Sequence, residues 1–302
     1  MEKNMRKEIF RGASTALVTP FRGGRIDYAS LDRLIEQQIA AGISALVIGG
    51  TTGEVATLGD SERYELYRYA RSLTEGRCKL ILGTGTNDTA TATKHTQEAE
   101  RIGCDGVLVV TPYYNKGTRE GVVKHYESIA KCAYLPIIVY NVPSRTGVDL
   151  LPSQVERLLE NDNIVAIKES SGKPGRLKEL SHIEGLCLYA GNDKEALEAI
   201  SYGGCGVVSV VSNLYPCQVN AMLEAALHGD MQVASAIMTR LSPVIDAMFL
   251  ETNPAPIKYA LSRKGACSGE LRLPMWEVGE DIKARIDAAI DDFEMREAQS
   301  EA

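Results

Sequence analysis

A lysine closes one of the most apolar stretches of this 302-residue chain. Residues 164–167 read Ile-Val-Ala-Ile, which predicts a short buried β-strand, and Lys168 follows directly. An ammonium group is costly to bury unless it is paired or loses its proton. A neutral amine attacks ketones to give an imine, which serves as an electron sink for carbon–carbon bond formation. Lys168 is therefore either a catalytic nucleophile or a rim residue paired with Glu169.

Other polar side chains follow neighbouring apolar runs and could act together with Lys168. Tyr140 closes the preceding run, and its phenol could carry protons to and from an intermediate if another hydroxyl relays them. Thr51 and Tyr114 could supply that relay. Each of these residues, taken alone, is also compatible with packing at the rim of a core, so the chemistry depends on the fold bringing them together.

Two further features could bind carboxylates. Gly49, Gly50 and Gly53 flank a pair of threonines, which predicts a tight loop with exposed backbone N–H groups and hydroxyl donors from Thr52 and its neighbour. Arg145 offers a guanidinium fork for a second carboxylate. The alternatives are a plain turn for the loop and an exposed surface position for the arginine.

The chain alternates short β-rich apolar runs with longer segments of helical spacing, such as 30–42 and 121–133. This alternation predicts a parallel sheet covered by helices. Eight runs have strand character: residues 14–21, 45–50, 79–85, 106–112, 136–142, 164–170, 186–191 and 206–213. Eight units over about 210 residues favour a closed (β/α)8 TIM barrel, in which chemistry lies at the carboxyl ends of the strands.

An open doubly wound sheet is the alternative fold, but no dinucleotide-binding fingerprint accompanies it. The sequence at 83–88, Gly-Thr-Gly-Thr-Asn-Asp, follows a strand-like run but lacks the G-x-G-x-x-G spacing. After residue 214 only helical patterns follow. We therefore expect a barrel catalytic domain over residues 1–230 and a C-terminal α-helical domain over residues 231–302.

The composition disfavours several classes of function. A formal net charge of −7 argues against binding to nucleic acid or to an anionic membrane surface, and no apolar run is long enough to span a bilayer. The seven cysteines are scattered without a C-x-x-C pair, and the N-terminus lacks a secretory signal, which is typical of a cytoplasmic protein. We expect no metal centre, and packing or surface roles for His95, His125, His182 and His228.

Six short motifs occur in an order that resembles the dihydrodipicolinate synthase family. They are IGGTTGE (48–54), TPYYNK (111–116), YNVPSRTG (140–147), IKESSG (167–172), AGND (190–193) and LRLPM (271–275). Each motif alone is modest, but their joint order and spacing are specific, and the resemblance runs from about residue 9 to about 290. It places the chain in the superfamily of pyruvate-dependent class I aldolases and N-acetylneuraminate lyases.

The resemblance implies a catalytic scheme with no cofactor, because the intermediate is a covalent pyruvate imine on Lys168. Pyruvate would condense with L-aspartate 4-semialdehyde in lysine biosynthesis, in a homotetramer. Tyr140 would be the proton donor and acceptor, with Thr51 and Tyr114 completing its relay and Tyr114 reaching in from a neighbouring subunit.

The same resemblance implies where the substrates bind. Thr52 would hold the pyruvate carboxylate, and the backbone at Val208 would border the same pocket. Gly191 would lie near that cavity. Arg145 would bind the semialdehyde carboxylate at the entrance, and it separates this form from the sugar-acid lyases of the superfamily, which usually place another residue there. The alternatives are such a sugar-acid aldolase and a non-catalytic barrel that binds a keto acid.

One departure from the family concerns regulation. Members inhibited by lysine carry a serine, histidines and a glutamate at the positions that correspond here to Val55, Asp60, Arg63 and Thr91. A lysine ligand would lose a hydroxyl at Val55 and an anionic partner at Thr91, although Asp60 adds a carboxylate nearby. We therefore expect inhibition by lysine to be weak or absent.

Overall fold

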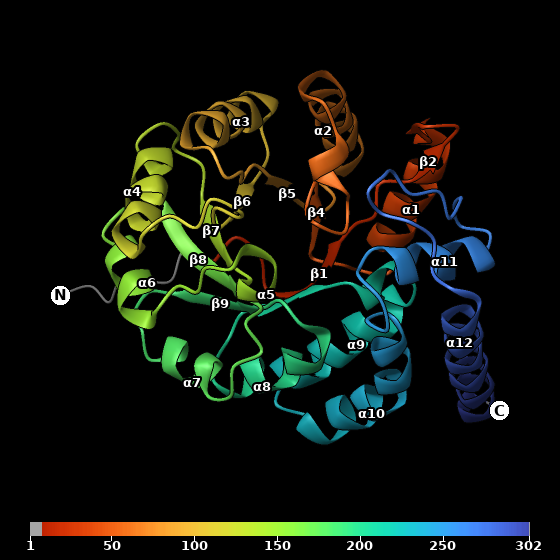
Figure 1. Cartoon of the computed structure of the whole chain (residues 1–302). Coiled ribbons are helices and arrows are strands. Elements are labelled where there is room, and N and C mark those ends of the chain that lie inside the picture. The colour runs from red at the N-terminus through yellow and green to blue at the C-terminus, as the bar shows by residue number, and fades with distance from the viewer. Residues whose placement is uncertain (1–7, 302) are drawn as a thin grey trace.

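The computed structural model describes residues 8–301 and contains a closed barrel of eight parallel strands surrounded by helices (Figure 1). The barrel strands are β1 (Gly12–Ala16), β4 (Ala45–Ile48), β5 (Lys79–Gly83), β6 (Gly106–Val110), β7 (Ile137–Asn141), β8 (Ile164–Glu169), β9 (Cys187–Ala190) and β10 (Gly206–Ser209). Strand β10 pairs in parallel with β1, with Val208 opposite Ser14. This pairing closes the sheet, confirms the TIM barrel and excludes the open doubly wound alternative.

Helices follow the strands and cover the outside of the barrel. They are α1 (Tyr28–Ala40), α2 (Asp60–Thr74), α3 (Thr89–Ile102), α4 (Arg119–Ala130), α6 (Pro152–Leu158), α7 (Arg176–Ser181), α8 (Ala196–Ser201) and α9 (Pro216–Leu227). The short helix α5 (Pro143–Thr146) follows β7 and lies at the mouth of the barrel, inside the ring of outer helices in Figure 1. Polar residues before three helices act as N-caps: Asp27, Asp88 and Thr118 each accept a backbone N–H of the first turn. These caps satisfy donors that an isolated helix end would leave unpaired.

Three more helices follow the barrel: α10 (Met231–Ala247), α11 (Ala255–Arg263) and α12 (Glu280–Glu301). Helix α10 packs against both α9 and α12, so the C-terminal helices continue the outer layer on one side of the barrel (Figure 1). The expected domain boundary at residue 230 falls in the turn between α9 and α10. That the two parts are separate domains stays a prediction.

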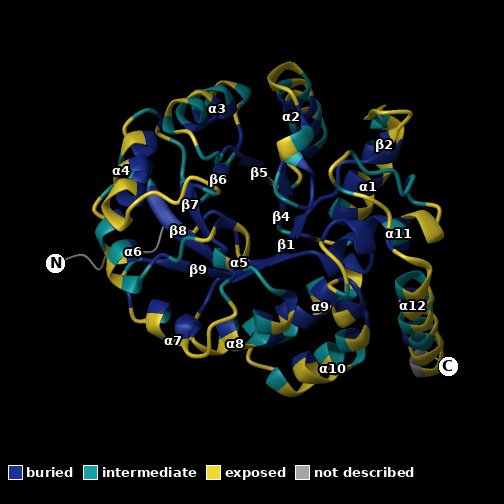
Figure 2. Cartoon of the chain, in the orientation of Figure 1, coloured by how far each residue is buried: buried dark blue, intermediate teal, exposed yellow. Residues whose placement is uncertain are grey.

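The barrel strands are the most buried part of the molecule, whereas the outer faces of the helices are exposed (Figure 2). One apolar cluster fills the barrel interior and includes Ala45, Ile81, Ile138, Ala166 and Val208. A second, larger cluster lies between the strands and the helices. The near-continuous apolar character of the strands follows from this burial on both faces.

Two predicted strands extend four residues or more beyond the ends of the observed strands. The run 14–21 ends as β1 at Ala16, and Phe21–Arg22 (β2) instead forms a hairpin with Arg25–Ile26 (β3). Its turn, Gly23–Gly24, has φ values of 58° and 75°, the left-handed conformation that a tight two-residue hairpin requires. The run 206–213 ends as β10 at Ser209 and continues as a 3-10 turn, because Asp193 accepts the backbone N–H of Val210 at 3.0 Å.

Candidate active site

Lys168 and Tyr140 lie side by side at the carboxyl ends of β8 and β7, where they are partners in the parallel register. Lys168 is 6% exposed, and its Nζ lies 4.1 Å from the centroid of the Tyr140 ring. Within residues 8–299, no hydrogen bond or ion pair engages this Nζ. A buried amine without a carboxylate partner matches the nucleophile interpretation better than a structural ion pair does.

Glu169 is not the partner of Lys168, which removes the alternative interpretation. Side chains alternate along a strand, so Glu169 points away from the barrel interior. Its Oε2 accepts a hydrogen bond from Asn141 Nδ2 at 3.0 Å, and its Oε1 accepts one from the Ser171 N–H at 2.6 Å. This carboxylate therefore supports the backbone behind the site and leaves the lysine unpaired.

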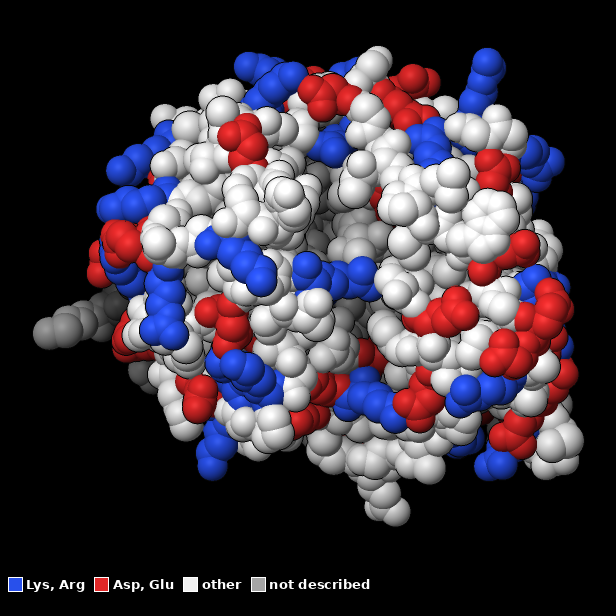
Figure 3. Space-filling model, viewed as in Figure 1, with Lys and Arg blue, Asp and Glu red and all other residues white. Residues whose placement is uncertain are grey.

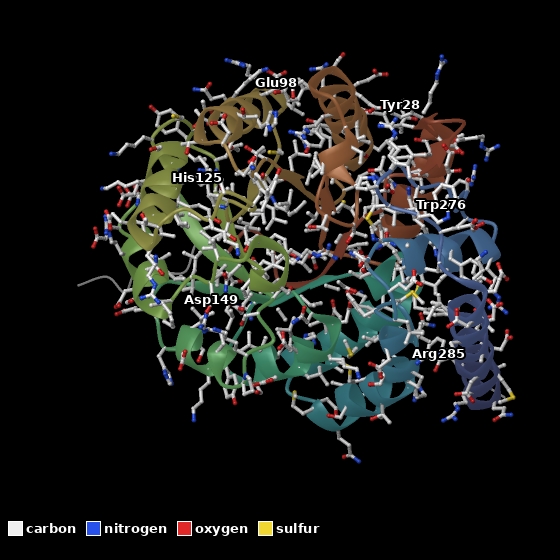
Figure 4. All side chains as sticks on the ribbon, viewed as in Figure 1. Tyr28, Glu98, His125, Asp149, Trp276 and Arg285 are labelled. Atoms are coloured by element: carbon white, nitrogen blue, oxygen red, sulfur yellow. The ribbon has the colours of Figure 1, made fainter. Side chains whose placement is uncertain are left out.

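Asn141 connects this carboxylate to a second one. Its Nδ2 also donates to Asp149 Oδ1 at 3.0 Å. Burial opposes ionisation of Asp149, but hydrogen bonds from Arg176, Lys173 and Asn141 outweigh that effect and lower its pKa to about 2. Asp149 lies in the loop after α5, close to the strand ends (Figure 4). The two charged groups hold the ends of β7 and β8 together from the outside of the barrel.

A cavity of about 170 Å³ opens at the carboxyl ends of the strands and is lined by Lys168 and Tyr140. Sites for drug-sized ligands measure about 300–1,000 Å³, so this cavity fits a smaller molecule. Its wall also contains four of the predicted binding and relay residues: Thr51, Thr52, Arg145 and Gly191. The face of the molecule seen in Figure 3 is hollowed near its centre, with Lys and Arg side chains beside the hollow.

The loop after β4 presents its threonines to this cavity through an unusual backbone. Gly49 has φ of +71°, and a Cβ placed there would lie 2.1 Å from the Tyr67 hydroxyl, so only glycine fits. The N–H groups of Gly53 and Glu54 are used within the turn, at 3.1 Å and 3.0 Å. The predicted set of exposed N–H donors is therefore smaller than expected: in the described chain, those of Thr51 and Thr52 lack a backbone acceptor.

Gly191 makes room for the side chains of Ser170 and Lys168. A Cβ at this position would fall 1.8 Å from Ser170 Oγ and 2.9 Å from Lys168 Cε. Any side chain would therefore displace the lysine from its place against Tyr140. Its role in the site is thus to leave space, since its own N–H already donates to the Glu169 carbonyl at 2.7 Å.

Two predicted residues are not in the cavity wall of this chain. Val208 is fully buried in the barrel interior, and Val210, two residues later, lines the cavity instead. Strand β10 ends at Ser209, and the turn that follows brings Val210 over the pocket. That the backbone at Val208 borders the same pocket stays a prediction. Tyr114 is 88% exposed and lies outside the cavity. A role for it therefore requires another subunit, as the resemblance implies.

Several residues of the wall were missed from the sequence. Phe249 and Asn253 come from the segment between α10 and α11, which sequence patterns assign to the peripheral helices. Ser170 lines the same cavity, and its Oγ is buried without a hydrogen-bond partner among the described residues. The sequence contains one signal for this segment, the Asn253-Pro254 step before α11. Such a step predicts a turn of the chain, but it does not indicate where in the fold that turn lies.

The C-terminal segment is fastened to the threonine loop by a buried ion pair. Lys258 on α11 is 0% exposed and pairs with Glu54, and it also donates to the Glu270 carbonyl at 2.8 Å. The backbone N–H of Arg272 donates to the second carboxylate oxygen of Glu54 at 3.0 Å. Burial lowers the pKa of Lys258, and the charge of Glu54 opposes that shift. Arg272 belongs to the LRLPM motif, so this motif stabilises the threonine loop although it lies far from that loop in the sequence.

Asp193 is a buried carboxylate near the lysine. It accepts hydrogen bonds from Ser209 Oγ and from the Val210 N–H. Burial raises the pKa of Asp193, while these hydrogen bonds and the charge of Lys168 act in the opposite direction. Its geometric effect is to fix the turn that carries Val210 into the cavity wall.

The histidines lie away from this site, as expected. His95 and His125 are buried on α3 and α4, His182 and His228 are exposed, and His125 lies in the outer ring of helices (Figure 4). Among the residues that the structure describes, no cluster of His, Cys, Asp and Glu could hold a metal ion, no disulfide joins the cysteines, and no helix is long and apolar enough to cross a membrane.

The fold and the site define a class of enzyme. A closed parallel barrel that holds a buried lysine against a tyrosine, with hydroxyls and an arginine around a small cavity, has the arrangement of a class I aldolase-type lyase.

Comparison with known proteins identifies the family. A profile of the Dihydrodipicolinate synthetase family matches residues 9–293. The 4-hydroxy-tetrahydrodipicolinate synthase of Kosmotoga olearia is 44% identical over 289 residues, which cover 94% of this chain and 98% of that protein. The chain therefore belongs to the dihydrodipicolinate synthetase family. Its function is that of a 4-hydroxy-tetrahydrodipicolinate synthase, a lyase of lysine biosynthesis.

Solved structures agree. The 4-hydroxy-tetrahydrodipicolinate synthase of Methylacidiphilum fumariolicum superposes with a TM-score of 0.94 at 41% identity, covering 96% of this chain and 98% of that one. The dihydrodipicolinate synthase of Acinetobacter baumannii, solved in complex with pyruvate, superposes with a TM-score of 0.91 at 36% identity, covering 94% and 98%. The predicted family, fold and enzyme class are thus confirmed.

Proposed function

We propose that this chain condenses pyruvate with L-aspartate 4-semialdehyde through an imine on Lys168. The observation that carries the proposal is the unpaired, buried Lys168 amine, which shares a cavity of about 170 Å³ with Tyr140 and Arg145. The amine adds to the ketone carbon of pyruvate, and loss of water leaves an imine. Removal of a methyl proton then gives an enamine, whose carbon attacks the aldehyde. The amine of the semialdehyde, after loss of a proton, displaces Lys168 from the resulting imine carbon, which closes a ring and frees the lysine amine.

Each remaining residue has a part that its position supports. Tyr140 moves protons during loss of water and enamine formation, with Thr51 as the next hydroxyl of the relay. Thr52 binds the pyruvate carboxylate, and Arg145 binds the carboxylate of the semialdehyde at the entrance. Gly191 leaves the space in which the lysine moves. Val210 forms part of the wall, and the backbone at Val208 borders the same pocket.

We further propose that the enzyme works as a homo-oligomer, a tetramer built as a dimer of dimers. The exposed Tyr114 supports this proposal, because a phenol that lies outside its own cavity can complete the relay only in a neighbouring subunit. Its backbone has φ of 71°, an uncommon value for tyrosine that indicates a constrained loop.

Reductive trapping tests the chemistry. Borohydride in the presence of pyruvate should add one pyruvate-sized adduct per chain, which peptide mass spectrometry should locate on Lys168. Lys168→Ala should abolish the adduct, whereas Lys173→Ala, which removes a nearby exposed lysine, should not change it. A coupled assay with pyruvate and L-aspartate 4-semialdehyde should show turnover. An adduct on another residue, or no turnover, would overturn the proposal.

A further inference from the structure

Asn253 lies between the two residues to which the carboxylates are assigned. Its Nδ2 donates to Thr52 Oγ1 at 2.9 Å, and its backbone carbonyl accepts from Arg145 Nη2 at 3.2 Å. Asn253 is 6% exposed and lines the cavity that contains Lys168. One residue from outside the barrel thus contacts both predicted carboxylate positions.

The contact with Thr52 sets the direction of a hydroxyl proton. Because Thr52 Oγ1 accepts the amide N–H of Asn253, its own O–H remains available as a donor. No acceptor for that proton occurs in the part of the chain that the structure describes. A carboxylate bound in the cavity would take it.

The other half of the Asn253 amide is unsatisfied. Its Oδ1 is buried and has no hydrogen-bond partner among the described residues. Leaving a buried acceptor unpaired costs about 1–3 kcal/mol, so such an atom in a cavity wall points to a ligand that supplies a donor. The adjacent Arg145 side chain would hold a carboxylate. A carboxylate and a hydrogen-bond donor on one carbon are the two polar groups of an α-amino acid.

Competing acceptors do not meet this requirement. The buried carboxylate of Asp193 is occupied by the Ser209 hydroxyl and by backbone N–H groups. Glu251 is exposed and lines only a shallow outer hollow with Arg145, not the inner cavity. Asn192 is only half-buried, and its side chain is held by a hydrogen bond that its Nδ2 donates to Glu195 at 2.7 Å. Asn253 Oδ1 and Ser170 Oγ are thus the buried acceptors in the wall that have no partner among the described residues, and of these two residues only Asn253 is hydrogen-bonded to both Thr52 and Arg145.

We propose that Asn253 is a specificity residue, whose Oδ1 accepts a hydrogen bond from the α-ammonium group of the semialdehyde while Arg145 binds its carboxylate. This inference rests on the proposed function. It explains why the site would select an amino-acid aldehyde: an aldehyde acid without the amine leaves Oδ1 unpaired when the cavity closes over it. We expect the enzyme to prefer the amino aldehyde over such an acid by about 10- to 100-fold, because one buried unpaired polar group weakens binding by about that factor.

Two aldehydes test the inference in the unmodified enzyme. L-Aspartate 4-semialdehyde and succinic semialdehyde have the same carbon chain and carboxylate, but only the first has the amine. The KM of the first should be about 10- to 100-fold lower than the inhibition constant of the second measured against it. Equal values would overturn the inference. Absence of any turnover of the amino aldehyde would instead overturn the proposed function.

Variants locate the effect. Asn253→Leu should remove the preference by raising the KM for the amino aldehyde, with the inhibition constant of succinic semialdehyde changed by less than about 3-fold. Asn253→Asp keeps acceptor oxygens, so it should keep the preference while raising the KM for pyruvate, because its carboxylate can take the Thr52 proton. Glu251→Gln, the matched control, should leave the preference intact.

Opposite results would assign the ammonium elsewhere. Loss of preference in Glu251→Gln, or equal losses for both aldehydes in Asn253→Leu, would show that Asn253 has only a structural role. Borohydride trapping of pyruvate on Lys168 in each variant confirms that its barrel is intact. If Asn253→Leu fails to trap pyruvate, the comparison of the two aldehydes in the unmodified enzyme decides.

Discussion

Lys168 Nζ lies 4.1 Å from the centroid of the Tyr140 ring, across the pairing of β8 with β7. The amine and the phenol come from adjacent strands, and the backbone register of these strands places the two residues next to each other. Neither side chain therefore depends on a loop for its position. A rigid pair of this kind can exchange protons through an intermediate bound between them.

Tyr140→Phe tests the phenol separately from the ring. The variant keeps the aromatic face against Lys168 but removes the proton donor, so turnover should fall by about 10²–10⁴-fold. Pyruvate should still be trapped on Lys168 when borohydride is given enough time, because the nucleophile is unchanged. Near-normal turnover in the coupled assay would contradict the role proposed for Tyr140.

Mixed subunits test the proposed position of Tyr114. Tyr114→Phe and Lys168→Ala should each be poorly active as pure proteins. Dissociated and reassembled together, they form mixed pairs in which the Tyr114→Phe subunit keeps Lys168 and receives an intact Tyr114 from its partner. Activity should recover to about a quarter of the unmodified level for random pairing across a two-fold interface. No recovery would mean that Tyr114 acts within its own chain or not at all.

The buried pair of Glu54 and Lys258 should dominate the stability of the C-terminal attachment. Glu54→Gln leaves a fully buried ammonium without its partner, and the free energy of unfolding should fall by about 3–5 kcal/mol in a urea titration. Glu98→Gln, which breaks exposed pairs with Arg68 and Arg101, should cost at most about 1 kcal/mol. Equal effects of the two substitutions would contradict this ranking.

Because of His125, the free energy of unfolding should decrease at acidic pH. Burial lowers its pKa from 6.5 to about 4, with only partial opposition from Asp88. Between these values the unfolded chain binds a proton that the native state does not, so stability should fall as the pH drops from about 6.5 to about 4, by on the order of 3 kcal/mol.

A variant isolates this contribution from that of the carboxylates. His125→Gln should flatten the pH dependence of the unfolding free energy in that window, whereas His228→Gln, at an exposed position, should not. Parallel curves for the unmodified enzyme and His125→Gln would show that the ring titrates normally.

Lysine should inhibit the enzyme weakly or not at all. The carboxylate of Asp60 is the group near this position that would attract an amine, but it already accepts a hydrogen bond from Lys94 Nζ at 2.7 Å and contacts His95 Nε2 at 3.1 Å. Arg63 donates to the Val55 carbonyl at 3.1 Å and adds a positive charge that disfavours a cationic ligand. Half-inhibition by sub-millimolar lysine in the coupled assay would contradict this expectation.

Much of the fold could be predicted because the apolar runs and the helical spacing between them are local features of the sequence. The apolar runs gave the positions of all eight barrel strands, and their alternation with helices gave the parallel closed sheet. The ends of β1 and β10 could not be predicted. They are decided by side chains from distant segments: Asn213 Oδ1 accepts the Val18 N–H at 3.0 Å after β1, and Asp193 accepts the Val210 N–H at 3.0 Å after β10. Such hydrogen bonds compete with strand pairing without changing the apolar pattern.

The sequence alone determined most of the candidate site: Lys168, Tyr140, the threonine pair, Arg145 and Gly191 stand at strand ends that a barrel brings to one face. Only the tertiary structure decided that Glu169 turns away from the lysine, that Val210 lines the pocket, and that Asn253 reaches Thr52 across 201 residues of chain. The reason is physical. Local sequence sets which side chains exist at a strand end, whereas side-chain direction and contacts between distant segments follow from packing that no short stretch of sequence encodes.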